Sequence, residues 1–361
     1  MSSKILFIVP YPFNTAPSQR LKFEQYYTEL GKMGYEITDR PFISTQFWKI
    51  VYKKGFYLKK IFYTIIAYFK RYTLLTTLSK YDIVYVHLWG TPFGTPLYEY
   101  LLCKFSKKLV YDIDDLVYKG NSSPNNKYVS ILKSGSKVNF LMKHADEVLV
   151  STDKLLDYTR QFTHKVSLIP ATIDVKKYDL KSINKSDAVV VGWSGSHTTS
   201  KYVHILDNVF KKLASAHNIK IMIMGDPAFT MDSVNIELVQ WSAEKEIEYL
   251  QLFDIGIHPV PDEEWVYGKS GGKLVQYMAA GIPIVASAIG PNFKVIKNEF
   301  NGFLVNSEEE WLNKLELLII NEALRKQMGV NSRHHAETFF SVETNLKHYL
   351  AIFNNLSIKE R

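Results

Sequence analysis

Residues 265–287 read WVYGKSGGKLVQYMAAGIPIVAS, and this stretch joins a glycine- and lysine-rich turn, an amphipathic helix and a buried strand. The turn, 268–273, offers backbone N–H groups at a helix start and two ammonium groups, a combination that suits a phosphate. The apolar positions that follow predict a helix, which Gly281 and Pro283 end before a strand at 284–286. Turns that connect strands to helices in this way are typical of doubly wound sheets, which present ligands at strand ends.

The length and composition of the chain predict two ordinary domains. The chain has 361 residues, of which 46% are apolar, enough for two separate cores. The longest apolar runs, such as 61–69, are far shorter than the roughly 20 residues of a membrane span. A start that runs directly into the apolar residues 5–9 predicts a first core strand without a cleavable signal. The single cysteine, Cys103, excludes an internal disulfide and favours a reducing cytoplasm.

The net charge of +8 is unevenly placed along the chain. Residues 1–185 hold 28 Lys and Arg against 15 Asp and Glu, a balance of +13, and the remainder holds 16 against 21, a balance of −5. The two halves are therefore expected to face different partners. The basic half favours an anionic surface or substrate: membrane lipid, a phosphate-bearing acceptor or nucleic acid.

Apolar, β-branched runs alternate with helical patterns along the whole chain, which predicts an α/β fold of parallel sheets covered by helices. Each half is expected to form a Rossmann-like sheet, and the polar stretch 176–187 is the candidate linker. The expected strands of the first half are 5–10, 82–88, 109–114, 148–151 and 166–170. Those of the second half are 188–193, 220–225, 236–240, 255–259 and 284–287.

Two candidate functional residues lie near strand ends of the first half. Ser18 is expected to cap a helix over 19–33. Arg20, on the first turn of that helix, either holds an anionic substrate or is an ordinary surface charge. His87 ends the strand 82–88, where it either faces the ligand crevice or is a satisfied core residue.

Three carboxylates, Asp112, Asp114 and Asp115, lie at the end of the next strand. They repel one another unless a cation, sugar hydroxyls or backbone N–H groups offset their charge. Asp112 and Asp114 also satisfy an Asp-x-Asp pattern that can hold a divalent metal and a diphosphate, although such short matches are common by chance. Asp115 has the alternative role of a helix N-cap.

Residues 42–80 carry eight Lys and Arg interleaved with aromatic side chains and no Asp or Glu. A basic, aromatic, partly helical segment of this kind can lie in a bilayer interface and neutralise anionic headgroups. The alternative is a pair of ordinary helices with aromatic side chains in the core and lysines in water. RNA binding is also compatible with this composition, but no RNA-binding signature accompanies it, so no nucleic-acid partner is expected.

Six phrases of the chain form a recognisable set: ADEVLVS at 145–151, PATID at 170–174, VVGWSGS at 190–196, FDIGIHP at 253–259, MAAGIPIVA at 278–286 and FSVE at 340–343. Together they resemble the glycosyltransferase family 4 enzymes of the GT-B fold (glycosyl transferases group 1), and the likeness is strongest from Ala145 onward. The resemblance implies two Rossmann-like domains facing across a cleft, over 1–180 and 181–338. It also implies a final helix over 339–361 that crosses back to the first domain.

The resemblance implies transfer of a sugar from a nucleotide-sugar to a hydroxyl acceptor, usually with retention of anomeric configuration and with no metal or cofactor required. The donor would bind the second domain, and a glycan or lipid-linked acceptor would bind the first. The WSGS phrase at 193–196, together with the variants around 268–281, resembles a branch found in polysaccharide pathways. The expected location is the cytoplasm or, through contact of 42–80, the inner face of the membrane.

Two departures from the family pattern affect the donor site. Family members usually carry two glutamates seven residues apart, and here the second position is Gln276, whose amide can still bond two ribose hydroxyls. The first falls in a loop that an insertion has remodelled, where Glu263 and Glu264 are the candidates. The usual arginine is also replaced by small and hydroxyl-bearing residues, so Lys269 and Lys273 are expected to supply the positive charge.

The sequence therefore predicts a retaining GT-B glycosyltransferase. Its alternatives are a catalytically silent nucleotide-sugar-binding homologue, a basic membrane- or RNA-binding module, and a metal-dependent variant acting through the Asp-x-Asp pattern. The predicted catalytic residues are His87, Asp112, Asp114 and Lys273, and the predicted acceptor-binding residues are Arg20 and Asp115. The predicted donor-binding residues are Gly195, Ser196, Thr198, Thr199, Glu263, Glu264, Gly268, Lys269, Ser270, Gly271, Gly272 and Gln276.

Overall fold

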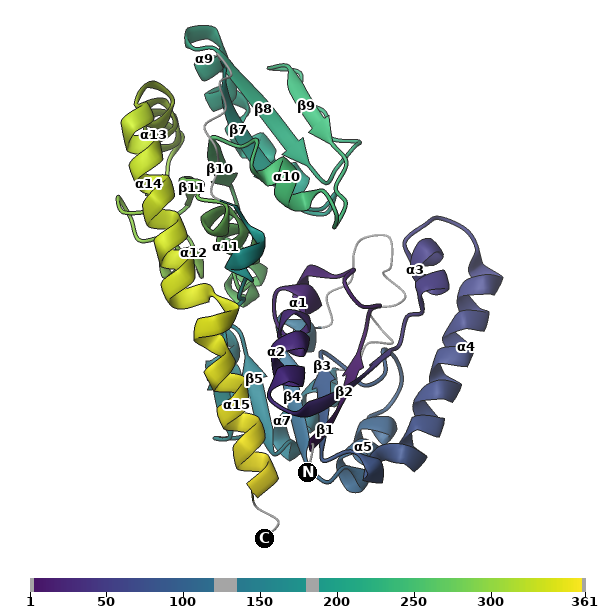
Figure 1. The fold of residues 1–361 in the computed structure, drawn as a ribbon. Coiled ribbons are helices and arrows are strands. Elements are labelled where there is room, and N and C mark those ends of the chain that lie inside the picture. Colours follow the sequence, from purple (N-terminus) through teal and green to yellow (C-terminus); the bar gives the residue numbers. More distant parts are fainter. Residues whose placement is uncertain (1–2, 120–134, 180–187, 359–361) are drawn as a thin grey trace. The chain divides into compact units, whose positions relative to one another are not determined.

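The computed structural model describes residues 3–119, 135–179 and 188–358. The chain divides into two compact units, shown in Figure 1. Unit 1 comprises Met1–Pro170, Gly268–Ser270 and Leu346–Arg361, and unit 2 comprises Ala171–Tyr267 and Gly271–Asn345. Residues 180–187 of the predicted linker lie outside the described residues.

Unit 1 is built on a six-stranded parallel sheet of order β2-β1-β3-β4-β5-β6. Its strands are β1 (Ser3–Val9), β2 (Tyr35–Pro41), β3 (Ile83–His87), β4 (Leu109–Ile113), β5 (Glu147–Val150) and β6 (Val166–Leu168). The five predicted strands are confirmed, but β2 was missed. This edge strand reads YEITDRP and is only partly buried, so it lacks the continuous apolar run of a central parallel strand.

The helix predicted over 19–33 is wrong as a single element, because three short segments occupy this region. They are α1 (Pro17–Arg20), the 3-10 segment η1 (Glu24–Tyr26) and α2 (Tyr27–Lys32). The expected cap at Ser18 is also wrong, since Ala16 is the N-cap and Pro17 begins the helix. Proline has a fixed φ and no N–H to lose, which makes it well suited to the first helical position.

The remaining helices of unit 1 cover its sheet and include most of the basic segment 42–80. They are α3 (Thr45–Val51), α4 (Tyr57–Leu74), η2 (Leu75–Lys80), α5 (Leu97–Phe105), η3 (Val117–Lys119), α7 (Gly135–His144) and α8 (Asp153–Thr159). The last helix, α15 (Val342–Ile358), belongs to unit 1 from Leu346 onward. There the Tyr349 ring lies 4.6 Å from the Tyr26 ring, centroid to centroid, within the core.

Unit 2 is built on a second six-stranded parallel sheet, of order β12-β11-β10-β7-β8-β9. Its strands are β7 (Val189–Ser194), β8 (Ile219–Met224), β9 (Ile236–Val239), β10 (Ile255–His258), β11 (Ile284–Ser287) and β12 (Gly302–Val305). The five predicted strands are again confirmed, and again an edge strand, β12, was missed. β12 reads GFLV and begins with glycine, a residue that is depleted in strands.

The helices of unit 2 are η5 (Val175–Lys177), η6 (Ser200–Leu206), α9 (Asp207–Ala216), α10 (Glu246–Leu250), η7 (Glu264–Gly268), α11 (Gly272–Ala279), α12 (Asn292–Val295), α13 (Glu308–Ile320), α14 (Glu322–His335) and the π-helical turn η8 (Ala336–Phe340). Several of them contact the sheet: α9 touches β8, α11 touches β10 and β11, and α13 touches β11 and β12. The predicted helix after the glycine-rich turn is α11, and Gly281 follows it with φ +70°, in the left-handed conformation typical of a helix end.

The centre of the unit 2 core depends on a glycine in strand β7. A Cβ placed on Gly192 would lie 2.1 Å from Cγ of Phe253, a buried side chain that precedes β10. The aromatic ring therefore packs directly on the backbone of β7, a contact that any larger residue would break.

We expect Gly192→Ala to lower the free energy of unfolding by about 1–3 kcal/mol, because an overpacked core forces side chains and backbone to shift. Gly31→Ala is the matched control. A Cβ on Gly31, in helix α2, meets nothing within 4 Å, and alanine is the better helix former. Urea unfolding followed by circular dichroism measures both, and an unchanged midpoint for Gly192→Ala would contradict this account.

Candidate functional site

In unit 2, the turn before α11 takes its shape from Gly271. This residue is the N-cap of α11 and has φ +73°, a left-handed conformation that glycine adopts at little cost. A Cβ there would also lie 2.9 Å from Cγ2 of Val295. No side chain caps the helix, which begins at Gly272. Its N-terminus therefore presents amide groups and a partial positive charge, both of which favour an anion.

Lys273, on the first turn of α11, lies against the loop that follows β7. Its Nζ donates to Oγ1 of Thr199 at 3.2 Å and lies 4.6 Å from the ring centroid of Trp193. A Cβ on Gly195 would come within 2.4 Å of the same Nζ. The structure thus brings together three predicted site residues, Gly195, Thr199 and Lys273, around one ammonium group.

Two further contacts hold the loop after β7 in place. The buried Tyr277 hydroxyl accepts a 2.8 Å hydrogen bond from the backbone N–H of Ser194. Burial raises the pKa of Tyr277, so this hydroxyl stays protonated. Gly225 has φ +106°, and a Cβ on it would lie 1.9 Å from the carbonyl oxygen of Gly195. These residues were not predicted as part of the site, because their role depends on contacts between different strands and helices.

His258, at the carboxyl end of β10, is a site residue that the sequence analysis did not single out. Burial and, secondly, the Lys273 ammonium lower the pKa of His258 to about 3, and the Asn292 side chain only partly opposes them. Its imidazole is therefore neutral near pH 7. Its buried Nδ1 has no hydrogen-bond partner within the described ranges. The only sequence signal was its place in the FDIGIHP phrase.

Of the other donor-binding residues predicted in unit 2, Gln276 is buried, whereas the serine, threonine and glutamate side chains lie at the surface. Ser196 and Thr198 bond each other through their hydroxyls at 2.8 Å, at the surface. Of the two candidate glutamates, Glu264 begins η7, while Glu263 accepts a 2.6 Å hydrogen bond from Nε1 of Trp265. By contrast, Gln276 is buried on α11.

The remaining part of the glycine-rich turn, Gly268–Ser270, belongs to unit 1. Lys269 Nζ there lies 2.5 Å from Oδ2 of Asp115, and both side chains are partly exposed. Oδ1 of Asp115 accepts from the N–H of Leu116 at 2.8 Å. A Cβ on Gly268 would lie 2.4 Å from Cγ of Leu116. Asp115 is therefore balanced by a cation and a backbone N–H, two of the partners that the sequence analysis considered for the three carboxylates.

A buried polar group lies at the carboxyl ends of β3 and β4. Nδ1 of His87 is 2.7 Å from Oδ2 of Asp112, and the Lys22 ammonium forms an ion pair with Oδ1 of the same carboxylate. All three side chains are almost completely buried. Burial alone would raise the pKa of Asp112, but Lys22 and His87 outweigh it, and the pKa is lowered. A cation is one of the partners that the sequence analysis considers for the carboxylates at this strand end, and Lys22 supplies it for Asp112.

Asp114 follows directly and has the opposite electrostatic balance. Burial raises its pKa, and the charges of Lys22 and His87 only partly oppose that effect. Its Oδ1 and the Nε2 of His87 are both buried without a hydrogen-bond partner among the residues that the structure describes. A carboxyl group and an imidazole thus retain unused hydrogen-bonding capacity at adjacent strand ends.

The turn after His87 is strained. Leu88 has φ +58°, a left-handed conformation that costs a non-glycine residue of order 1 kcal/mol. Three hydrogen bonds hold Leu88 in this conformation. Its N–H donates to Asp112 O at 2.8 Å, and its carbonyl oxygen accepts from the Tyr111 hydroxyl at 2.8 Å. The Trp89 N–H donates to His87 O at 2.7 Å. This strain lies directly beside the histidine, as is common at functional sites.

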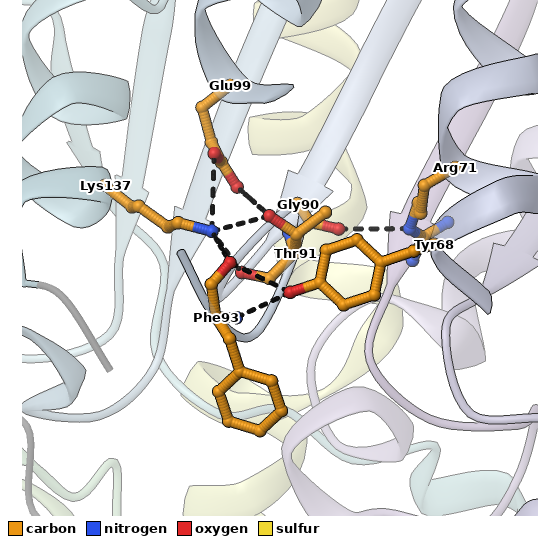
Figure 2. A network of polar contacts seen from close by, with 7 residues as sticks. All are labelled: Tyr68, Arg71, Gly90, Thr91, Phe93, Glu99 and Lys137. Atoms are coloured by element: carbon orange, nitrogen blue, oxygen red, sulfur yellow. Dashed lines mark hydrogen bonds and ion pairs between the residues drawn. The ribbon is translucent and has the colours of Figure 1, made fainter. Parts of the chain in front are cut away.

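Figure 2 shows how the loop beyond Leu88 is held by a buried lysine. Lys137 Nζ, from α7, donates to Thr91 Oγ1 at 2.6 Å and to the Phe93 carbonyl at 2.6 Å. Glu99, from α5, lies 3.7 Å from the same ammonium and accepts from Thr91 N and Oγ1 at 2.9 and 3.0 Å. Burial lowers the pKa of Lys137, and Glu99 partly opposes this. The two buried charges thus compensate each other and fix the loop.

The predicted Asp-x-Asp pattern does not form a recognisable metal centre. Within 3–119, 135–179 and 188–358, no group of three or more His, Cys, Asp or Glu side chains is arranged to hold a metal ion. The Asp112 carboxylate is instead occupied by Lys22 and His87.

We expect Lys22→Met to destabilise the protein by about 3–5 kcal/mol at pH 7, because it leaves Asp112 buried without its ammonium partner. In the wild type, the lowered pKa means that the stability contributed by Asp112 is present above its unfolded pKa and is lost as pH falls through the folded pKa. In the variant, burial raises the pKa, so the protein should gain stability as the pH falls from 7 to 5. Urea unfolding at several pH values measures both effects.

Lys176→Met is the control, because Lys176 and Glu343 form an ion pair at the surface. Their side chains are 70% and 65% exposed. Its loss should change the free energy of unfolding by less than about 1 kcal/mol. Equal stability of the two variants at pH 7 would refute a structural role for the buried pair.

Comparison with known proteins relates the site in unit 2 to a family. Residues 188–321 match the family model described as Glycosyl transferases group 1. The capsular polysaccharide biosynthesis glycosyltransferase CapM of Staphylococcus aureus is 24% identical over 170 residues, which cover 43% of this chain and 43% of that protein. The chain spans less than half the length of the curated relatives it matches.

Solved structures cover the chain more fully. A glycosyltransferase from Rickettsia africae superimposes with a TM-score of 0.70 at 15% identity, over 98% of each chain. Anabaena HepE, solved in complex with UDP and glucose, superimposes with a TM-score of 0.66 at 16% identity, over 98% of this chain and 99% of that one. At these identities the likeness shows the fold. The two parallel six-stranded sheets thus have the GT-B fold, and residues 188–321 match the glycosyl transferases group 1 domain.

Proposed function

We propose that this protein is a retaining glycosyltransferase that moves a sugar from a nucleotide-sugar donor to a hydroxyl acceptor. The observation that carries the proposal is the position of Lys273, on the first turn of α11 and against Gly195 and Thr199, inside the matched domain. An ammonium group beside a helix N-terminus is suited to the leaving diphosphate of such a donor.

On the donor side, Lys273 and the N-terminus of α11 stabilise the charge that develops on the diphosphate. Positioned donors of this kind are worth about 3–4 kcal/mol in a transition state. The amide of Gln276 bonds the ribose, and Glu263 or Glu264 contacts hydroxyls of the sugar. His258 is neutral beside Lys273, so it adds a hydrogen-bonding group without adding charge.

On the acceptor side, Asp114 is the residue best suited to orient the acceptor hydroxyl and accept its proton. Its pKa is raised, and its Oδ1 has no partner among the described residues. Asp112 has a different role, because Lys22 and His87 hold it charged and hydrogen-bonded. It fixes the His87 ring so that the remaining nitrogen, Nε2, is left for a sugar hydroxyl.

The biological setting that we propose is cell-surface polysaccharide or glycoconjugate synthesis, with a glycan or lipid-linked acceptor and without a required metal. Similarity to CapM supports a polysaccharide role, and the UDP complex of HepE supports a uridine diphosphate donor. The proposed location is the cytoplasm, at the inner face of the membrane. In 3–119, 135–179 and 188–358, no helix has the length and hydropathy to cross a bilayer.

We expect Lys273→Ala to reduce kcat about 10²- to 10³-fold, because the developing diphosphate charge loses its ammonium partner. Mass spectrometry of a panel of nucleotide-sugars incubated with the protein and EDTA would identify the donor and then measure its turnover. Lys326→Ala, at an exposed pair with Glu322, is the control and should retain full rate. Full activity of Lys273→Ala would remove its central role. Donor-induced thermal stabilisation without turnover in the wild type would instead indicate a silent binding protein.

We expect Asp114→Asn to lower kcat about 10²- to 10⁴-fold, the usual range for loss of a positioned base. Because the pKa of Asp114 is raised, the wild-type rate should increase as pH rises through that pKa, when the carboxylate becomes available. The variant should lose this ascending limb. Rates measured between pH 5 and 8 test the point, with Asp157→Asn, an exposed position on α8, as the control. An unchanged pH profile in Asp114→Asn would exclude it as the base.

A further inference from the structure

Helix α4 exposes a continuous stripe of large apolar side chains. Leu58 is 84% exposed, and Ile61, Phe62, Ile65 and Phe69 are each 57–69% exposed. At about 100° per residue, these five positions lie within roughly 100° of one another around the helix, so they form a single face. The stripe runs about 16 Å along the helix axis, at 1.5 Å per residue. Large exposed apolar patches on a folded protein commonly mark an interaction surface.

Residues beside and opposite the stripe pack α4 firmly on unit 1, so the stripe is not the result of a loosely docked helix. Arg71 is buried, and its guanidinium donates to the carbonyls of Gly90, Arg40 and Val9 at 3.0, 2.7 and 2.8 Å. Tyr68 accepts from the Phe93 N–H at 3.0 Å and donates to the Phe93 carbonyl at 2.9 Å, as Figure 2 shows. The helix is therefore bound to the carboxyl ends of β1 and β2 and to the loop after β3.

The charge around the stripe favours one kind of partner. The segment 42–80 holds eight Lys and Arg and no Asp or Glu. Lys59 and Lys70 are exposed and lie about 100–120° from Leu58 around the helix, on one flank of the stripe. A second copy of this chain would bring like charges together at such a face. An anionic lipid surface instead neutralises the lysines while its acyl region receives the apolar stripe.

We propose that the stripe Leu58–Ile61–Phe62–Ile65–Phe69 of α4 inserts into the interfacial region of an anionic lipid bilayer, with Lys59 and Lys70 at the headgroups. Figure 1 shows α3 and α4 at the margin of unit 1. Through Arg71 and Tyr68, the bilayer is then coupled to the sheet edge that carries His87 and Asp112. This surface gives the proposed function a membrane-bound acceptor, but lipid binding itself requires no sugar transfer.

The test is co-sedimentation of the full-length protein with vesicles of phosphatidylcholine and phosphatidylglycerol, compared with phosphatidylcholine alone. We expect the wild type to bind the anionic vesicles, more weakly at high salt, and Phe62→Ser/Ile65→Ser to reduce the partition coefficient by about tenfold or more. Lys59→Glu/Lys70→Glu should also weaken binding. Phe293→Ser/Ile320→Ser is the matched control in unit 2, because these side chains are 60% and 66% exposed, against 60% and 63% for Phe62 and Ile65. It should bind as the wild type does.

Several outcomes would overturn the proposal. These are no binding of the wild type to anionic vesicles, equal binding of the α4 variant and the wild type, or a dimer that dissociates only in the α4 variant. Binding to polyuridylate without binding to vesicles would assign the basic segment to RNA instead. Transfer to a water-soluble acceptor by the α4 variant should remain at the wild-type rate, so failure of lipid binding and failure of the proposed enzymatic function can be told apart.

Discussion

Parallel strand pairing places the carboxyl ends of all strands at one edge of the sheet. This constraint locates the candidate site residues of each unit. In unit 1 it brings His87 next to Asp112 and Asp114, from sequence positions more than 20 residues apart. In unit 2 it brings the loop after β7 to the turn before α11, where Gly195 meets Lys273. Because helices cover the faces of such sheets, charged side chains are best accommodated at the strand ends.

Burial of charge at the strand ends of unit 1 has two consequences. Asp112 remains ionised because Lys22 and His87 lie in contact with it, whereas the neighbouring Asp114 has a raised pKa. The surroundings thus shift the pKa values of these two carboxyl groups in opposite directions. Such a difference often separates a structural anion from a group that exchanges protons. In the loop after His87, the buried charges of Lys137 and Glu99 likewise compensate each other.

The amino-acid composition of the segment 42–80 does not reveal which of its aromatic side chains are exposed. Its basic and aromatic content was compatible with two ordinary helices whose aromatic side chains lie in the core, and Phe42 and Phe47 do lie there. Phe62 and Phe69 do not, since Arg71 and Ala67 occupy the inward face of α4 instead. An arginine is found on that inward face because three carbonyl groups, at the ends of β1 and β2 and in the loop after β3, accept from it, and no local pattern reveals those acceptors.

The sequence by itself determined ten strands, including the edge strands β6 and β9, as well as the helix after the glycine-rich turn and its end at Gly281, because local apolar runs and glycine conformations encode these features directly. It did not determine the edge strands β2 and β12, which lack a distinctive pattern. Only the tertiary structure decided that Lys22 pairs with Asp112 and that Lys269 pairs with Asp115. These ion pairs join side chains 90 and 154 residues apart. The choice among nearby cations depends on which side chain the packed backbone directs at the carboxylate, and that is a property of the fold.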